Sequence, residues 1–179
     1  MLRYLKATDV ETICVINKEA LGYAFSPEET AGQLAKLTQD SHHFLLGFED
    51  SISHDLLGYV HAEVYESLYS KPGFNILALA VLPQTQGKGI GKTLLEGLEQ
   101  EAEKRGYNFI RLNSADHRTG AHAFYERVGY TCDKMQKRFI KLIKGEDLGF
   151  LTKMILKPMT RIFGMPLPKK RNANKIILN

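Results

Sequence analysis

Residues 74–92 constrain the fold more than any other part of this chain. The run FNILALAVL over residues 74–82 is almost wholly apolar, which is typical of a strand buried on both faces. Pro83 ends the run, and glycines follow at positions 87, 89 and 91, where the apolar face of a helix begins. A strand that enters a helix through a glycine-rich turn directs backbone N–H groups and the positive end of the helix dipole toward one point. The segment therefore predicts a site for a phosphate-bearing ligand.

Two well-known phosphate motifs do not fit this turn. A Walker A loop would end in Gly-Lys-Thr, as residues 91–93 do, but it requires glycine at position 86, where the chain has Gln86. The dinucleotide fingerprint G-x-G-x-x-G also fails, because the three glycines are spaced G-x-G-x-G. A nucleotide-binding protein is therefore a weaker interpretation of the turn.

The remaining sequence predicts an α/β protein with the element order β-α-α-β-β-β-α-β-α-β-β. The second helix has the clearest start, because Ser26 can cap it, Pro27 suits its first position and Glu29 completes a capping box. Thr8 and Asp9 can cap the first helix. Strands are expected at residues 2–7, 42–48, 56–64, 74–82, 107–112, 131–132 and 138–143, and helices at 10–21, 27–38, 90–105 and 121–128.

The turn and its flanks resemble one enzyme family. Gln86, Gly89 and Gly91 match the pattern Q-x-x-G-x-G, with which the GNAT (Gcn5-related N-acetyltransferase) family holds the pyrophosphate of coenzyme A. Residues 79–83 resemble the family's central strand, and residues 121–130 resemble its later segment A-x-x-F-Y-E-x-x-G-F/Y. The resemblance implies an α/β fold with a GNAT-like mixed central sheet flanked by helices.

The resemblance covers residues 1–144, which we interpret as the acetyltransferase domain, and leaves 145–179 as a basic, amphipathic C-terminal extension. Its cosubstrate is expected to be acetyl-CoA, with the pantetheine arm on the backbone of the central strand and the pyrophosphate in the turn. Asn113 follows the next strand, where the two central strands of this fold separate. Arg118 stands where many relatives have Asn, and whether it meets cofactor or acceptor stays open. The implied cofactor-binding residues are Leu79, Ala80, Val81, Gln86, Gly87, Lys88, Gly89, Ile90, Gly91, Lys92, Asn113, Arg118 and Phe124.

Tyr125 is the residue that the resemblance implies for catalysis, because in many relatives this tyrosine lies near the cofactor sulfur. Attack on a thioester ends in a departing thiolate, which a nearby O–H can protonate. The alternative is that Tyr125 only fills the apolar face of its helix.

The base that would take a proton from the acceptor is harder to assign, because residues 74–82 carry no carboxylate where many relatives place glutamate. The nearest candidates for the base are Glu63 and His61, of which Glu63 is preferred, although it could instead hold a cationic acceptor. His61 shares its face, since side chains alternate along a strand. Glu66 and Asp116 are more distant candidates.

We expect direct transfer of acetyl to a primary amine, because neither Cys14 nor Cys132 lies in a nucleophile motif. The mildly acidic surroundings of Glu63 favour a small-molecule acceptor. The alternatives are a protein-amine acetyltransferase and a non-catalytic acyl-CoA-binding regulatory module. No metal site is expected, because the adjacent His42 and His43 would point to opposite faces of a strand.

The net charge of +4 is concentrated in the extension, where residues 145–179 hold seven lysines and arginines against two acidic residues. The body is therefore close to neutral, and no nucleic-acid partner is expected. Apolar residues in 151–162 recur at helical spacing beside a basic stripe that Pro158 interrupts. The extension could pack on the body or in a homodimer, attach to an anionic membrane surface, or contact another macromolecule. The N-terminus has no apolar signal core, and we expect a cytoplasmic, reduced protein.

Overall fold

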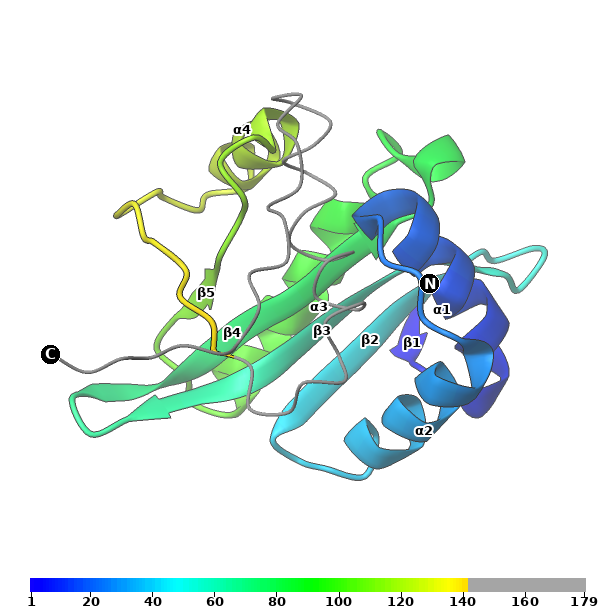
Figure 1. Cartoon of the computed structure of the whole chain (residues 1–179), viewed down its shortest axis with the longest axis horizontal. Helices are drawn as coiled ribbons and strands as arrows, with labels where there is room; N and C mark the ends of the chain where they lie inside the picture. The colour runs from blue at the N-terminus through cyan, green and yellow to red at the C-terminus, as the bar shows by residue number, and fades with distance from the viewer. Residues whose placement is uncertain (142–179) are drawn as a thin grey trace, which may run out of the picture. The chain divides into compact units, whose positions relative to one another are not determined.

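The structure is a computed structural model and describes residues 1–141. Its main feature is one mixed sheet of five strands (Figure 1). The strands lie in the order β1-β2-β3-β4-β5, so each strand pairs with the next one along the chain. The first four are antiparallel to their neighbours, and β5 runs parallel to β4. The strands are β1 (Leu2–Tyr4), β2 (His43–Glu49), β3 (Leu56–Ser67), β4 (Ser70–Val81) and β5 (Ile110–Leu112).

Helices cover both faces of this sheet, with α1 and α2 on one face and α3 on the other (Figure 1). The predicted mixed sheet flanked by helices is confirmed. The α-helices are α1 (Val10–Ile16), α2 (Pro27–Leu37), α3 (Ile90–Lys104) and α4 (Thr119–Arg127). Short helical segments of other types are η1 (Ala7–Asp9), η2 (Asn17–Leu21) and η3 (Pro83–Thr85).

Two apolar cores follow from the alternation of side chains along the strands. On one face Phe74 and its neighbours pack against α3, whose residues Leu94, Leu95 and Leu98 are almost completely buried. Burying each of these side chains contributes about 1.5–3 kcal/mol. On the other face α1 and α2 pack against the sheet around Ile16. The α1/α2 face and the α3 face are therefore distinct environments.

The helix signals in the sequence are confirmed at α2. Ser26 is its N-cap and accepts a hydrogen bond from the backbone N–H of Glu29, whose carboxylate accepts one from the N–H of Ser26. The predicted first helix is only partly α-helical, because residues from Asn17 onward form the π-helix η2. It ends where predicted, at Gly22, which has φ of +79°.

The sequence predicted that residues 74–82 form a strand buried on both faces. This prediction is wrong at Leu77, because β4 contains a bulge there. His61 of β3 lies opposite Ala78, and Ala62 lies opposite Ile76, so Leu77 has no partner. The Leu77 side chain is 48% exposed. The bulge shifts the alternation by one residue, so that Ala78 packs on the α1/α2 face and Leu79 on the α3 face.

Other predicted strands are shorter or missing. The first strand ends at Tyr4 rather than 7, and the fifth is Ile110–Leu112 rather than 107–112. Residues 131–132 form no strand, and neither do residues 138–141, the described part of the strand expected at 138–143. Among residues 1–141 they have no strand partner to complete their backbone hydrogen bonds.

The chain consists of two compact units, Met1–Asp133 and a second that begins at Lys134. The domain boundary predicted at 144/145 and the interpretations of the extension lie outside the described residues. Within residues 1–141, no helix has the length and apolar character that crossing a membrane requires.

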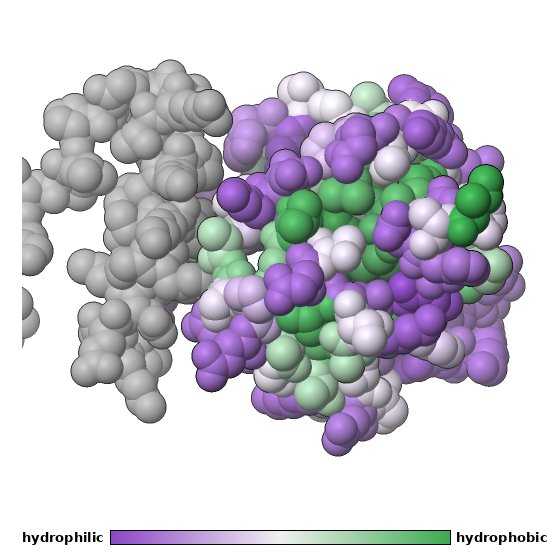
Figure 2. All heavy atoms as spheres, turned by 90° about the vertical axis from the view of Figure 1, so that its right-hand side faces the viewer, coloured by the Kyte–Doolittle hydropathy of each residue, from purple (hydrophilic) through white to green (hydrophobic). Residues whose placement is uncertain are grey.

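Apolar side chains reach the surface on the side of the molecule that Figure 2 shows, where hydrophobic patches are surrounded by hydrophilic residues. Exposed large apolar residues of the N-terminal third include Val15, Tyr23 and Ile52. Single exposed apolar side chains are ordinary in soluble domains.

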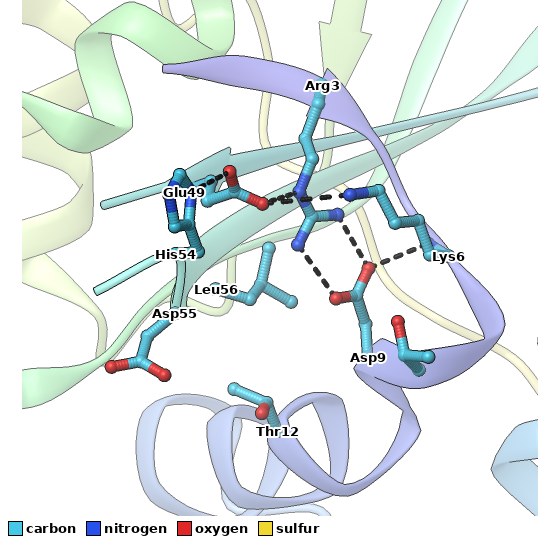
Figure 3. Close-up of a pocket in the computed structure, with 9 residues that line it drawn as sticks. Arg3, Lys6, Asp9, Thr12, Glu49, His54, Asp55 and Leu56 are labelled. Atoms are coloured by element: carbon cyan, nitrogen blue, oxygen red, sulfur yellow. Dashed lines mark hydrogen bonds and ion pairs between the residues drawn. The ribbon is translucent and has the colours of Figure 1, made fainter. Parts of the chain in front are cut away.

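A network of charges fastens β1 to β2 and to the first helical turn (Figure 3). Arg3 donates two hydrogen bonds of 2.8 Å to the carboxylate of Asp9 and a further one to Glu49. Glu49 also pairs with His54 at 3.0 Å, and Asp9 accepts from the backbone N–H of Lys6 at 2.7 Å. Asp9 therefore caps the preceding turn η1, and not α1 as the sequence predicted. The hydrogen bonds from His54 and Arg3 lower the pKa of Glu49 to about 2.

This network predicts acid sensitivity. Since folding lowers the pKa of Glu49 from 4.5 to about 2, its ionised form stabilises the fold above about pH 4.5, and this contribution is lost as the pH falls toward 2. We expect Glu49→Gln to lower the urea midpoint at pH 7, and the difference from wild type to shrink between pH 4.5 and 2. Glu103→Gln, at an exposed position of α3, should change little at any pH. A difference for Glu49→Gln that is independent of pH would contradict this account.

Candidate active site

The central feature of the site is a gap between β4 and β5. The two strands pair only from Phe74, opposite Ile110, to Ile76, opposite Leu112. Beyond these residues β4 continues to Val81, with only β3 as its partner. Within residues 1–141, one side of β4 from Leu77 to Val81 therefore has no strand partner, so an extended ligand can pair there as an added strand.

The open side of β4 leads into the N-terminus of α3. Gly89 is the N-cap, and no side chain caps the helix. The first N–H bonded within the helix is that of Thr93, which donates to the Gly89 carbonyl at 3.0 Å. The N–H groups of Ile90, Gly91 and Lys92 are thus left without helical partners. A 15-residue helix with a free N-terminus is a favourable place for a phosphate group.

The glycines of the turn have two different roles. Gly87 and Gly89 have φ of +79° and +82°, and a Cβ at either position would meet no atom within 4 Å. Their left-handed backbone shapes a turn that is open to a ligand. Gly91 instead allows close packing, because a Cβ there would lie 3.3 Å from Cζ of Phe124 in α4.

The polar residues of the turn are arranged around this opening. Gln86 donates from Nε2 to the carbonyl of Val81 at 3.1 Å, which fixes the turn to the end of β4. Lys88 is exposed, and Lys92 forms an exposed ion pair with Glu96 at 3.6 Å. Gln86 therefore shapes the turn through the protein's own backbone, and both lysines remain at the surface near the free helix end.

Tyr125 lies on the α3 face of the sheet. Its ring packs against the core beneath α3 and contacts Phe124 and Tyr130, with centroid distances of 5.3 and 5.7 Å. Burial raises the pKa of Tyr125, and the charge of Arg118 opposes this. The Tyr125 hydroxyl makes no hydrogen bond within the described residues, so it can donate to a ligand.

A polar row crosses the opposite, α1/α2 face at the level where β4 and β5 still pair. It consists of His43, Glu63, Asn75 and Arg111, which lie directly opposite one another on β2, β3, β4 and β5. Asn75 donates from Nδ2 to Oε1 of Glu63 at 2.9 Å. The Oδ1 atom of Asn75 is buried and has no partner within the described residues. A buried acceptor of this kind favours a ligand with an N–H group.

His61 lies beside this row, one step nearer the gap. Its Nε2 atom is 3.1 Å from Nδ1 of His43. Burial, and secondarily the nearby His43, lower the pKa of His61 to about 4, while Glu63 opposes the shift. His61 is therefore neutral at pH 7, and His61 and Glu63 share a face as the sequence predicted.

Sequence reasoning did not select three members of this arrangement. The sequence suggests a role for His43 only as a possible metal ligand, and it gives no signal for Arg111. Asn75 had a visible signal, since it is the one polar residue in the run 74–82. Within residues 1–141, no group of three or more His, Cys, Asp or Glu side chains could hold a metal ion.

Two residues that were predicted to bind the cofactor, Asn113 and Arg118, form hydrogen bonds with other residues of the protein. Asn113 lies at the mouth of the gap, just after β5, and accepts a hydrogen bond from Arg111 at 3.2 Å. Arg118 is the N-cap of α4 and donates to the carbonyl of Leu21 at 3.4 Å. Arg118 thus links α4 to the end of η2, and its contact with cofactor or acceptor stays a prediction.

The polar hollow of Figure 3 is a weaker candidate for chemistry. It encloses about 340 Å³ and is lined by the Arg3, Asp9 and Glu49 network. Because these charged groups pair with one another, the hollow offers a ligand little unsatisfied charge.

The backbone of the turn predicts opposite effects for two Gly→Ala substitutions. Gly89→Ala forces a side chain into the left-handed region, which should destabilise the fold by about 1–2 kcal/mol. The control is Gly32→Ala in the middle of α2, where a Cβ meets nothing within 4 Å and helix propensity should stabilise the fold by about 0.5–1 kcal/mol. Urea denaturation measures both changes. Equal signs for the two variants would show that the Gly89 conformation is not required.

Comparison with known proteins agrees with this geometry. No match was found among curated protein sequences. A transcriptional regulator from Bacillus halodurans is 17% identical over 79% of this chain and 99% of that chain, with a TM-score of 0.71. The aminoglycoside 6'-N-acetyltransferase AAC(6')-IG from Acinetobacter haemolyticus is 14% identical over 80% and 99%, with a TM-score of 0.69. A GNAT family acetyltransferase from Staphylococcus aureus is 22% identical over 80% and 98%, with a TM-score of 0.63.

These solved structures share the fold of the chain. The sequence profile of the Acetyltransferase (GNAT) family matches residues 10–130, which is more than half of the chain. The chain therefore belongs to the GNAT acetyltransferase family.

Proposed function

We propose that this protein transfers an acetyl group from acetyl-CoA directly to a primary amine of a small molecule. The observation that carries the proposal is the continuity between the unpaired side of β4, residues 77–81, and the uncapped N-terminus of α3. An extended amide-containing arm that ends in a pyrophosphate requires these two features in this order.

The residues present fit acetyl-CoA. The backbone of Leu79, Ala80 and Val81 would pair with the two amides of the pantetheine arm. The N–H groups from Gly87 to Lys92 would hold the pyrophosphate, because no Cβ obstructs the turn at positions 87 and 89. Bound acetyl-CoA would supply the acetyl thioester near the start of the gap.

Tyr125 is proposed to donate a proton to the departing sulfur. Its half-buried hydroxyl has no partner within residues 1–141, and burial raises its pKa, so it remains protonated at pH 7. In the transfer, a C–N bond forms between the amine and the acetyl carbon while the C–S bond breaks. The proton of Tyr125 then neutralises the thiolate.

Glu63 is proposed to face the incoming amine from the α1/α2 side. Its carboxylate is held by Asn75, so it is fixed in position before an acceptor binds. The Glu63 carboxyl group and the unsatisfied Asn75 oxygen beside it are both acceptors, so together they would bind the N–H groups of an ammonium. This supports a cationic amine as the acceptor.

The cysteines support direct transfer rather than a covalent acetyl-enzyme. Cys14 belongs to α1, with its Sγ 3.2 Å from Oγ1 of Thr30 in α2, and Cys132 is exposed after α4. Neither lies on the strands that border the gap.

A second candidate function is a non-catalytic acyl-CoA-binding regulatory module. It is favoured by the absence of any carboxylate from residues 74–82, and one structural neighbour is described as a transcriptional regulator. The aminoglycoside acetyltransferase neighbour favours the enzyme with a small-molecule acceptor. A protein amine is the remaining alternative for the acceptor.

The first test is release of free CoA thiol from acetyl-CoA in the presence of kanamycin, spermidine, tyramine, lysine and a lysine-containing peptide. We expect turnover with at least one small amine. Tyr125→Phe should lower kcat by about 10²-fold or more without changing the Kd for acetyl-CoA, because only proton donation is lost. Tyr23→Phe, at an exposed tyrosine, is the control and should leave kcat unchanged. Tight acetyl-CoA binding without turnover of any amine would favour the regulatory module.

A second test concerns Glu63. Glu63→Gln should raise KM for a cationic amine by about tenfold or more, because a charge-assisted hydrogen bond is lost. Glu103→Gln serves as the control. An unchanged KM for Glu63→Gln would remove Glu63 from the acceptor site.

A further inference from the structure

Two histidines from adjacent strands meet on the α1/α2 face next to the gap. His61 of β3 lies 3.1 Å from His43 of β2, measured between Nε2 and Nδ1. Their rings are tilted by 52° with centroids 5.1 Å apart, so the contact is between ring edges and not a stack. A contact of this kind requires one ring to donate and the other to accept.

His61 and Tyr59 are the titratable residues of this face that stand opposite the open part of β4, and the hydroxyl of Tyr59 already donates to Asn17. The cross-strand neighbour of His61 is Ala78, whereas Glu63 lies opposite Asn75, where β4 still pairs with β5. Neighbouring strands are about 4.8 Å apart, so His61 is about one strand spacing from the open side of β4.

We propose that His61 removes a proton from the acceptor's ammonium group and in turn gives a proton to His43, while Glu63 holds the ammonium in place. This inference rests on the proposed function and assigns its base. In the required tautomers His61 is unprotonated at Nδ1, and its Nε2–H donates to Nδ1 of His43.

The ammonium loses two protons in the transfer: the relay carries one to solvent, and the second replaces the proton that Tyr125 gives to the departing sulfur. Nδ1 of His61 takes one proton from the ammonium as the amine nitrogen bonds to the acetyl carbon. The Nε2 proton of His61 moves to Nδ1 of His43, and the Nε2 proton of His43 leaves to solvent. After product release, proton exchange with water on both sides of the pair returns the two rings to their starting tautomers. His43 lines a hollow of about 450 Å³ beside Asp40 and Ser41, so the outer end of the relay borders open space.

The electrostatics of the pair keep His61 unprotonated and also make it a weak base, so the proton that it takes must pass on to His43 at once. Burial and the adjacent His43 lower the pKa of His61 to about 4, against the opposing effect of Glu63. These two side chains are the titratable groups that act on His61 from β2 and β3. Two residues earlier on the same face of β3, Tyr59 donates its hydroxyl to Asn17 of η2. An unprotonated histidine is therefore available throughout the neutral pH range.

The test is the pH dependence of kcat/KM for thiol release with the best amine of the panel, for wild type and His61→Gln. Gln keeps a hydrogen-bonding group near the Nε2 position but cannot take a proton. In wild type, kcat/KM should be constant between pH 6 and 8, because the cation binds and is deprotonated in the site. In His61→Gln it should fall about 10²-fold at pH 7 and rise about tenfold per pH unit, since only amine that is already neutral in solution can react.

His42→Gln, at the exposed neighbouring histidine, is the control and should match wild type. An unchanged Kd for acetyl-CoA checks that His61→Gln is folded. A constant profile in His61→Gln, at full rate or uniformly reduced, would overturn the relay, because a structural role lowers the rate equally at every pH. If wild type releases no thiol with any amine while binding acetyl-CoA, the proposed function fails first and the relay with it.

Discussion

The site depends on one constraint in the sheet. Within residues 1–141, one side of β4 beyond Ile76 has no neighbouring strand with which to form backbone hydrogen bonds. β5 pairs with β4 over three residues only, and it ends at Leu112 while β4 continues to Val81. β3 holds the other side of β4 along this stretch. Gly58 makes that pairing close, because a Cβ there would lie 2.7 Å from the carbonyl oxygen of Ala80. β4 can therefore stay in the sheet while one of its sides remains free for a ligand.

The gap also divides the chemistry between two faces of the sheet. Tyr125 belongs to the α3 face, together with the free end of α3, whereas His61 and Glu63 belong to the α1/α2 face. In the proposed reaction the proton donor for sulfur and the proton acceptor for the amine thus approach through the gap from opposite sides.

The two halves of the candidate site differ in how far they could be predicted. The phosphate turn is contiguous, so Gln86, Gly89 and Gly91 carried its signal in a few residues. The polar row comes from four strands, and its members become neighbours only through strand register. Register also depends on the bulge at Leu77, which no local pattern indicated and which moved Ala78 to the α1/α2 face.

The sequence by itself determined the fold class, the start of α2, the end of the first helical segment at Gly22 and the glycine turn. Caps, turns and apolar periodicity act within a few residues, so they can be read along the chain. Only the tertiary structure decided where β5 stops, which side of β4 stays open, and that His43 meets His61. These features depend on contacts between residues distant in sequence, and such contacts form only when the strands have aligned.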